Sequence, residues 1–338
     1  MIVRDAAGAA RTGAVALVLS LAMTLGARAA DDKTYVMKIS LATLNDVPHQ
    51  YAKDLAAALE RDSTGRIKPE IYPESQLGSI QRQIEGVQFG AIQMAVLPPE
   101  FYAGIDERFE VLTTPGLVKS IAEGQRLAAN PQVRDLILGL GAGKGLHGAG
   151  LIMGTQSSII AKTAIRHLAD LKGKKIRIFG SQFQSVAMKR LGAVPKPMTL
   201  GDVLPALQDN AVDGAVASIA IFNAMHFKDV AKYVTEIGQP ATFITVEISK
   251  KWYDSLPADL RQLLDKDAAA ESIAINPVAV EINDYARKAW TASGGELISL
   301  PPEEESSMLK ILAGVGDEVS NAKPQLAAAY KIVTDAAR

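Results

Sequence analysis

The stretch from Tyr35 to Pro73 constrains the fold most, because strand-like and helix-like patterns alternate along it. Residues 35–42 alternate apolar and polar side chains like a half-buried strand, and residues 67–72 form a second strand-like run. Between them lies an amphipathic helical pattern that ends at Thr64-Gly65. A strand, a helix and a second strand in this order are typical of a parallel sheet. The sequence therefore predicts an α/β fold with a largely parallel sheet.

A second pattern indicates two domains of related build. Residues 89–96 read as a turn and a buried strand after a helix, and residues 204–216 repeat helix, turn and strand in the other half. The chain is also long enough for two domains. A helical pattern then runs from Pro257 to about Ser293, which is about 54 Å long if unbroken. We expect Pro277 to kink this helix, and a helix of such length can brace both domains.

Residues 1–30 predict an export signal rather than part of the fold. Two arginines precede an apolar run from Ala14 to Leu25, and Ala27-Arg28-Ala29 has the small-x-small pattern of a cleavage site. The apolar run is short for a membrane span, so a retained membrane anchor is the weaker alternative. We expect cleavage to release an exported chain that starts at about Asp31.

Composition argues against several classes of function. Loss of the export signal would remove three arginines and one aspartate. The remaining chain would have 33 basic residues instead of 36 and 36 acidic residues instead of 37, so its net charge would change from −1 to −3. This balance argues against a nucleic-acid partner. Cysteine is absent, so the chain has no disulfide, no thiol nucleophile and no thiolate metal ligand.

Common enzyme motifs are also missing from the sequence. There is no G-x-S-x-G sequence for a serine nucleophile, and the four histidines are scattered without metal-ligand spacing. Gly143, Gly145 and Gly148 match G-x-G-x-x-G, but here a helix precedes the motif and a strand follows it, which reverses the order of a dinucleotide-binding site. We therefore expect no catalytic residues, no metal and no cofactor, and interpret the chain as a binding protein.

The stretch from Lys172 to Gly180 contains the strongest candidate for a binding residue. Ile176 and Ile178 indicate a short strand, and a helix begins near Ser181. An arginine on such a strand can hold a carboxylate through two parallel hydrogen bonds, and the free N–H groups of the helix start add a positive field. Arg177 is therefore a candidate carboxylate ligand, and the alternative is an ordinary solvated strand residue.

Several short motifs occur in an order that resembles a known protein family. They are Gln76-Leu77-Gly78, Lys172-Gly173-Lys174-Lys175-Ile176-Arg177, Leu191-Gly192-Ala193-Val194-Pro195-Lys196-Pro197-Met198, Ala206-Leu207-Gln208, Val212-Asp213-Gly214, and Trp252-Tyr253 with Leu256-Pro257. Each motif alone is weak, but the ordered set is specific and spans nearly all of the chain after the export signal. With this set the chain resembles the DctP-type solute-binding proteins of TRAP transporters, the tripartite ATP-independent periplasmic transporters.

The resemblance implies a two-domain α/β periplasmic binding protein, similar to the type II class, with a ligand cleft between the domains. Crossing strands and a long kinked brace helix would join the domains. We expect domain I to comprise residues 31–150 and about 242–275, and domain II residues 151–241 and about 276–338. The helix at 257–293 would brace both.

The resemblance also implies a function. Arg177 would clamp the carboxylate of an organic acid, and the protein would work in the periplasm. Its partners would be the two membrane subunits of the transporter, the small and the large, which an ion gradient drives. We expect the binding protein itself to be a monomer.

Two departures from the family pattern bear on the ligand. Many relatives have a second arginine where this chain has Ser157, and Glu-Asn where it has Val216-Ala217. A site with fewer polar groups favours a monocarboxylate with an apolar or aromatic body over a sugar acid, which needs many hydrogen-bond partners. A C4-type dicarboxylate is the alternative if Arg82, Lys162 or His49 supplies a second cation.

Further ligand contacts are expected near the carboxyl ends of strands, where open α/β sheets bind ligands. Besides Arg177 and Arg82, the candidates are His49, Gln76, Phe101, Gln156, Ser157, Phe179, Ser218 and Phe222. For each aromatic residue, packing in the core is the alternative. Two other functions stay open, namely a sensory binding protein that docks on a membrane receptor and an exported enzyme.

Overall fold

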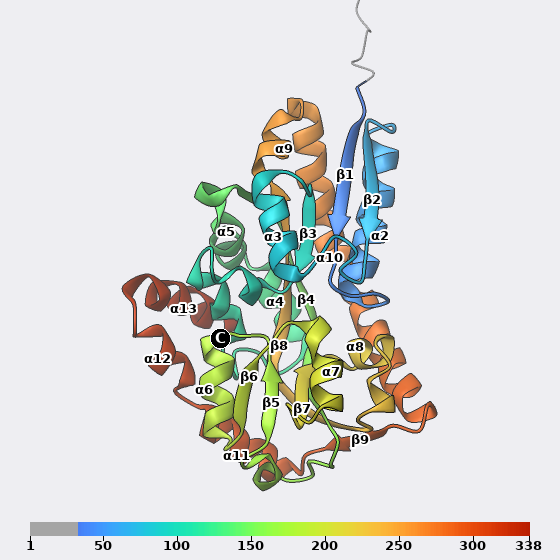
Figure 1. Cartoon of the computed structure of the whole chain (residues 1–338). Coiled ribbons are helices and arrows are strands. Elements are labelled where there is room, and N and C mark those ends of the chain that lie inside the picture. Colours follow the sequence, from blue (N-terminus) through green and yellow to red (C-terminus); the bar gives the residue numbers. More distant parts are fainter. Residues whose placement is uncertain (1–32) are drawn as a thin grey trace, which may run out of the picture.

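The computed structural model of the protein describes residues 33–338, and the expected export signal at residues 1–30 lies outside this part (Figure 1). The described chain begins with strand β1 (Tyr35–Ser40), helix α2 (Val47–Asp62) and strand β2 (Ile67–Tyr72). β1 and β2 pair in parallel over their whole length. The predicted start of strand, helix and strand is therefore confirmed.

Local chemistry explains where α2 begins and ends. The side chain of Asp46 accepts a hydrogen bond from the backbone N–H of His49 at 3.2 Å, which satisfies one of the free donors of the first turn. At the other end, Thr64 and Gly65 have φ angles of 53° and 78°. This left-handed backbone turns the chain after the helix, and glycine adopts it without steric cost.

The rest of the first half contains one more parallel strand and several helices. In chain order they are α3 (Ile80–Phe89), β3 (Met94–Leu97), the short 3-10 helices η1 (Pro99–Tyr102) and η2 (Glu107–Thr113), α4 (Ile121–Ala129), α5 (Pro131–Gly139) and η3 (Ala142–Lys144). β3 lies parallel to β1. The glycine-rich motif begins after α5, with Gly143 in η3, and runs into the next strand, which contains Gly148. This confirms that a helix comes before the motif and a strand at its end.

The second half carries its own parallel strands. In chain order its elements are η4 (Leu168–Leu171), β5 (Lys175–Ile178), α6 (Gln182–Arg190), β6 (Val194–Pro197), η5 (Leu200–Asp202), α7 (Val203–Gln208), β7 (Gly214–Ala217), α8 (Ile219–Ala224), η6 (Phe227–Asp229), β9 (Glu296–Ser299), α11 (Pro302–Leu312), α12 (Val315–Ser320) and α13 (Pro324–Ala337). β5 lies between β6 and β7 and is parallel to both. Ile176, Arg177 and Ile178 of β5 are buried, and Lys175 is half-buried.

Two long strands, β4 (Leu146–Ala161) and β8 (Tyr233–Ser249), run from one half into the other. They pair antiparallel along their length, with breaks in register after Gly148, Met153 and Gln156. β3 joins β8 in the first half and β7 joins β4 in the second, both antiparallel. The sheet order is β2-β1-β3-β8-β4-β7-β5-β6, with β9 on β8. The sheet is thus parallel toward its outer strands and antiparallel at its centre, which corrects the expectation of a largely parallel sheet.

Helix α10 (Ala258–Ala292) braces the two halves, as expected. Leu260, Leu264 and Ile275 pack in the core around β1 and α2, whereas Ala286 and Trp290 pack in the core around β7 and α8. The helix continues through Pro277, which cannot donate a backbone hydrogen bond to Ile273. The helix follows the short helix α9 (Lys250–Ser255) and extends beside both halves (Figure 1).

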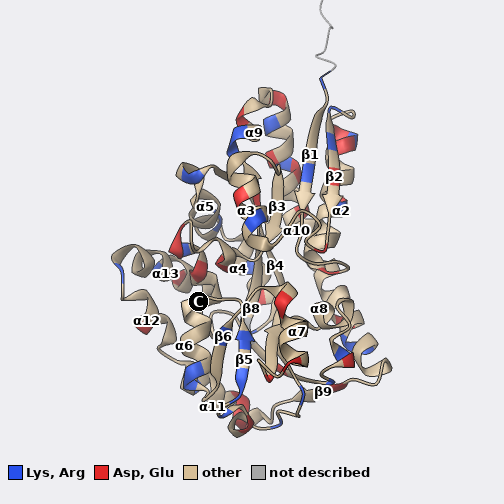
Figure 2. Cartoon of the chain, viewed as in Figure 1, with Lys and Arg blue, Asp and Glu red and all other residues tan. Residues whose placement is uncertain are grey.

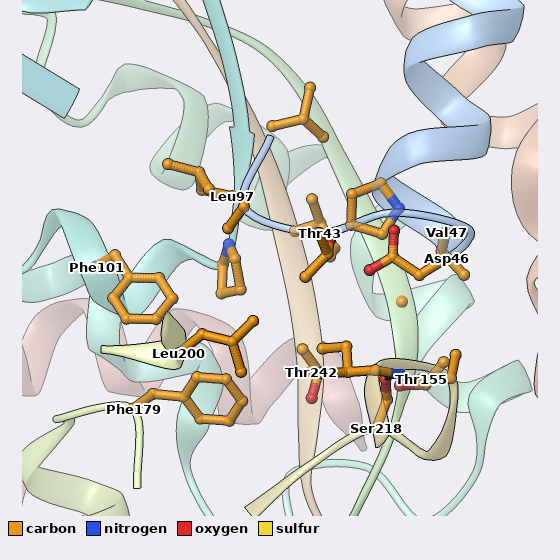
Figure 3. A pocket seen from close by; sticks show the side chains of 18 of the residues that line it. Thr43, Asp46, Val47, Leu97, Phe101, Thr155, Phe179, Leu200, Ser218 and Thr242 are labelled. Carbon is orange, nitrogen blue, oxygen red and sulfur yellow. Dashed lines mark hydrogen bonds between the residues drawn. The ribbon is translucent and has the colours of Figure 1, made fainter. Parts of the chain in front are cut away.

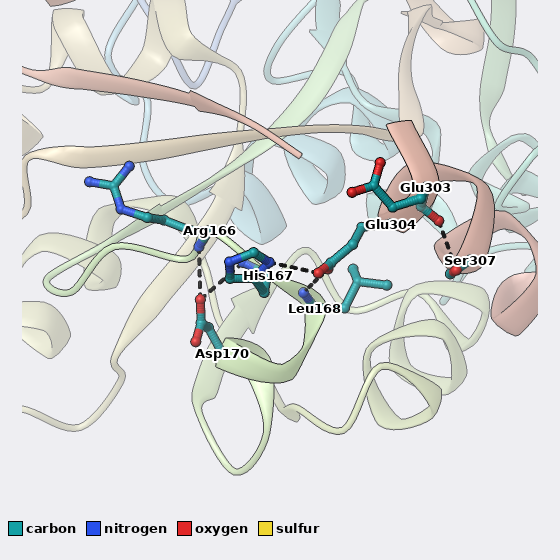
Figure 4. A network of polar contacts seen from close by, with 7 residues as sticks. All are labelled: Arg166, His167, Leu168, Asp170, Glu303, Glu304 and Ser307. Atoms are coloured by element: carbon teal, nitrogen blue, oxygen red, sulfur yellow. Dashed lines mark hydrogen bonds and ion pairs between the residues drawn. The ribbon is translucent and has the colours of Figure 1, made fainter. Parts of the chain in front are cut away.

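Polar contacts on the surface link α11 to the segment that precedes β5. Glu304 of α11 accepts from the ring of His167 at 2.7 Å and from the backbone N–H of Leu168 at 2.5 Å (Figure 4). Asp170 accepts from the backbone N–H groups of Arg166 and His167.

Basic and acidic residues are interspersed over the helices of both halves (Figure 2). No helix within residues 33–338 is long and apolar enough to span a membrane.

Candidate functional site

A cavity lies where strands of both halves end (Figure 3). Its first wall consists of residues that follow β1 and β3, namely Ala42, Thr43, Asp46, Val47, Pro48, Pro98 and Phe101, together with Leu97 at the end of β3. Its second wall consists of residues that follow β5, β6 and β7, namely Phe179, Leu200, Ser218, Ala220 and Ile221. The crossing strands contribute Gly154, Thr155, Thr242 and Ile244 between the walls.

The lining of the cavity is mostly apolar. Four hydroxyl groups reach it, from Thr43, Thr155, Ser218 and Thr242, and Asp46 is the one charged side chain among the described residues that line it. The cavity volume is about 50 Å³, which is room for a few water molecules. The site can therefore hold an apolar body, and a larger ligand requires the walls to separate.

Arg177 lies directly behind the second wall. Its side chain is fully buried, so the alternative of a solvated strand residue is wrong. Nε donates to the carbonyl oxygen of Met198 and Nη1 to that of Val216, each at 3.0 Å. Nη2 has no partner among the described residues. The guanidinium lies 4.6 Å from the ring centre of Phe179, which lines the cavity.

The charge of Arg177 is therefore poorly compensated. Burial lowers the pKa of Arg177 to about 10, and the negative field of Glu100 opposes this effect. Two backbone carbonyls hold the guanidinium without neutralising it. A buried cation with a free donor group is suited to receive an anion.

Glu100 and Glu110 approach this region from the first half. Glu100 is 7% exposed, and its Oε1 accepts from Nε2 of Gln184 at 3.4 Å. Glu110 accepts from the backbone N–H of Gln182 at 2.8 Å, at the start of α6. The hydroxyl of Thr113 lies 2.6 Å from that of Ser181, the N-cap of α6. Residues of η1 and η2 thus contact the helix that follows Arg177.

Asp46 gives the first wall a titratable group. Burial raises the pKa of Asp46 to about 6, while hydrogen bonds from Thr43 and from the backbone of His49 act in the opposite direction. Its side chain points toward the cavity (Figure 3). At neutral pH the carboxylate is mostly ionised, and it disfavours a second negative charge nearby.

The structure brings three of the predicted contact residues into the cavity lining, namely Phe101, Phe179 and Ser218. The rings of Phe101 and Phe179 meet edge to face across the cavity, with centres 5.8 Å apart. Phe222 does not reach the cavity. It packs in the core against Phe227 and Trp290, which was the alternative for an aromatic residue.

The polar candidates lie elsewhere. Gln156 and Ser157 line a separate depression with Glu236 and Arg287, because β4 changes register beside them. Ser157 still contacts the cavity residue Thr242 through its hydroxyl at 3.2 Å.

The remaining candidates also lie outside the lining. His49 lies in the first turn of α2, where its ring accepts from the backbone N–H of Asn45. Gln76 and Arg82 are exposed. Lys162 is engaged with Asn210 at 2.6 Å. None of these groups supplies a second cation to the cavity in this structure.

Sequence reasoning missed Asp46, Thr155, Thr242 and Glu100. Asp46 had a detectable signal, because an aspartate before an amphipathic helix is a typical N-cap and the loop follows a strand. The other three had none, since their position depends on pairing between β4 and β8 and on the docking of η1. Among residues 33–338 no three His, Asp or Glu side chains form a group suited to a metal ion.

Comparison with known proteins agrees with this architecture. The family model described as DctP, bacterial extracellular solute-binding protein, family 7, matches residues 40–322. The C4-dicarboxylate-binding periplasmic protein DctP of Rhodobacter capsulatus is 30% identical over 311 residues, which cover 90% of this chain and 91% of that protein. The 2,3-diketo-L-gulonate-binding periplasmic protein YiaO of Escherichia coli is 29% identical over 224 residues, 66% of this chain and 68% of that protein.

Solved structures share the fold. A TRAP periplasmic solute-binding protein of Haemophilus influenzae with bound L-gulonate has a TM-score of 0.83 at 18% identity and covers 90% of this chain and 100% of that chain. One from Desulfovibrio salexigens with bound orotic acid has a TM-score of 0.82 at 20% identity, with the same coverage. The chain therefore belongs to the DctP family of bacterial extracellular solute-binding proteins, family 7.

Proposed function

We propose that this protein captures an organic acid in the periplasm and delivers it to the membrane subunits of a TRAP transporter. The family consists of transport proteins rather than enzymes, and its relatives include binding proteins for dicarboxylates and for diketogulonate. An exported enzyme is therefore the weakest reading. A sensory role would need a membrane receptor in place of the transporter, and no observation favours it.

One observation carries the proposal, namely the buried guanidinium of Arg177. Two of its nitrogens are fixed by backbone carbonyls, and Nη2 has no partner among the described residues. A buried donor without a partner costs free energy, which a ligand carboxylate would recover. Backbone contacts also hold the guanidinium in one orientation, so little further ordering is needed when the ligand arrives.

The lining supports a monocarboxylate with an apolar or aromatic body. Phe101, Phe179 and Leu200 offer apolar surface to such a body. A second carboxylate would find no cation among the described lining residues and would approach Asp46 instead. The C4-dicarboxylate alternative rests on the relative from Rhodobacter capsulatus, and it requires a cation such as Arg82 to move into the cavity.

Ligand capture requires motion of the two halves. The cavity of about 50 Å³ is too small for most organic acids to enter, so the two halves lie close together in this structure. The two walls come from different halves joined by β4, β8 and α10, and we infer that the free protein opens about these connections in solution and closes again on its ligand. We expect hinge closure about these connections, with the domain boundaries near residues 150, 241 and 275. Small-angle scattering should show a more compact, monomeric particle with saturating ligand, and identical profiles would contradict closure.

A thermal-shift screen tests the proposal directly. The panel contains benzoate, phenylacetate and hexanoate as monocarboxylates, and succinate, malate and galacturonate for comparison. Binding raises stability by RT ln(1 + [L]/Kd), so the cognate class should raise the melting temperature, and Arg177→Ala should abolish the shift. Equal shifts in wild type and Arg177→Ala would contradict the site. Recovery of the bound acid unchanged separates transport from catalysis.

A further inference from the structure

Glu100 is a buried acid that the proposed carboxylate clamp does not use. It lies in η1 and is 7% exposed. Its side chain accepts a long hydrogen bond from Nε2 of Gln184, at 3.4 Å. It forms no ion pair with any residue in the described part of the chain. Because few hydrogen bonds stabilise this buried carboxylate, its negative charge needs compensation from another group.

Two chains of contact connect Glu100 to the Arg177 site. Gln184 donates to Glu100, and its Oε1 accepts from the backbone N–H of Phe179 at 3.1 Å. Phe101, the neighbour of Glu100, packs edge to face on Phe179, which in turn stacks on the guanidinium of Arg177. Glu100 is therefore held near the position that a ligand carboxylate must take.

The charged groups that face Glu100 are few. Arg177 on β5 attracts its negative charge, Glu110 on η2 repels it, and α6 presents the neutral amide of Gln184. Glu247 on β8, another buried acid, acts on Tyr102 rather than on Glu100. Arg177 is thus the one cation that acts on Glu100 among the described residues.

We propose that Glu100 is the proton-accepting counter-charge of the carboxylate site, so that a monocarboxylate bound at Arg177 is accompanied by uptake of one proton from solvent onto Glu100. No other bond forms or breaks. This inference rests on the proposed function. It assigns to Glu100 the role of setting which ligand charge the site accepts.

The physical reason is competition for a single buried cation. Without ligand, an ionised Glu100 partly balances Arg177. A ligand carboxylate brings a second negative charge into the same water-poor space, where like charges repel strongly. Two acids that share one site cannot both stay ionised at little cost, so the pKa of one rises. Burial already raises the pKa of Glu100 to about 7 in the free protein, so protonating it costs less than protonating the ligand.

A defined pH dependence follows. Ligand binding raises the pKa of Glu100 further, so the bound state holds more protons than the free state above about pH 7. Affinity should therefore be constant below about pH 6 and should fall about tenfold between pH 6 and pH 8. Proton uptake should be about half a proton per ligand at pH 7 and close to one at pH 8.

Calorimetric titration in buffers of different ionisation heat measures both quantities. The probe is the monocarboxylate of the panel with the largest thermal shift. Glu100→Gln, which mimics the protonated acid, should bind equally well at pH 6 and pH 8, within about twofold, and without proton uptake. The matched control is Glu247→Gln, which alters another fully buried glutamate and should keep the wild-type pH dependence. Proton uptake that persists in Glu100→Gln would overturn the inference.

A second measurement needs no ligand. The side-chain carboxyl ¹³C signal of Glu100, assigned by its loss in Glu100→Gln, should titrate near pH 7 in the free protein. It should titrate at least about one pH unit higher in Arg177→Met, which lacks the cation. A midpoint below pH 5, or one unmoved by Arg177→Met, contradicts the inference. Failure of every acid to bind would instead overturn the proposed function, whereas binding without proton uptake would overturn only the role of Glu100.

Discussion

The two walls of the cavity differ in the sign of the charge behind them. The first wall carries Asp46 in its lining, with Glu100 close behind it in η1. The second wall has no charged residue in its lining among the described residues, and the guanidinium of Arg177 lies behind Phe179. An anion that enters the cavity is therefore drawn toward the second wall and repelled by the first. We therefore expect the site to select the orientation of its ligand as well as its charge.

The two walls also differ in how their polar groups are satisfied. The carboxylate of Asp46 accepts hydrogen bonds at the start of its own helix, so it has hydrogen-bond partners without a ligand. Arg177 keeps Nη2 without a partner. Because free energy is gained mainly where a buried group lacks its partner, we expect the second wall to dominate affinity and the first wall to set selectivity.

The largest expected effect comes from Arg177→Ala. Removal of the guanidinium leaves the ligand carboxylate desolvated without a partner, which typically costs about 2–5 kcal/mol, or roughly thirty- to several-thousand-fold in affinity. Arg177→Lys keeps the charge but loses the planar fork, so it should also weaken binding clearly. Calorimetric titration with the acid found in the screen measures both. An Arg177→Ala affinity within about threefold of wild type would mean that the second wall does not dominate.

The next effect concerns the aromatic pair that joins the walls. Phe179→Ala removes the ring from the guanidinium, a contact of about 0.5–2 kcal/mol, and should weaken binding up to about thirtyfold. A double-mutant cycle with Phe101→Ala should give a coupling of about 0.5–1.5 kcal/mol in the free energy of unfolding of the ligand-bound protein. Strictly additive effects of the two changes would show that the rings do not meet when ligand is bound.

A smaller effect is expected from Asp46→Asn on the first wall. Asparagine keeps the helix cap but removes the charge. Succinate should bind more tightly, by about 1 kcal/mol or roughly fivefold, because a like charge is lost, while the monocarboxylate affinity should stay within about twofold. The pKa of Asp46 is raised to about 6, so its carboxylate ionises as pH rises, and the gain should be full at pH 8 and vanish at pH 5. A gain for the monocarboxylate as large as for succinate would contradict the proposed selectivity.

The smallest effect is expected from Gln156→Ala. Its Nε2 donates to the carbonyl oxygen of Lys119 at 3.1 Å, and the residue lines a separate depression. Affinity should therefore stay within about twofold of wild type in the same titration. A loss above tenfold would place Gln156 in the site and would require the crossing strands to shift when ligand binds.

Local sequence patterns were enough to predict most of the secondary structure and to single out Arg177 as the candidate anchor of the site. Strand and helix periods, the Thr64-Gly65 stop and the long pattern around Pro277 are local signals, because each depends on the order of neighbouring side chains. Arg177 was recognisable for the same reason, since it lies on a short apolar strand just before a helix start. Phe101, Phe179 and Ser218 were predicted because each follows a strand and lies in a loop at its carboxyl end.

Which neighbour of each predicted residue lines the cavity depends instead on tertiary contacts. Thr155 lines it where Gln156 and Ser157 were expected, because β4 changes register against β8 on either side of this segment. One extra residue in a strand moves the next side chain to the opposite face. Glu100 meets Gln184 across 84 positions of sequence. No local period encodes either event, because both depend on which segments the folded chain packs together.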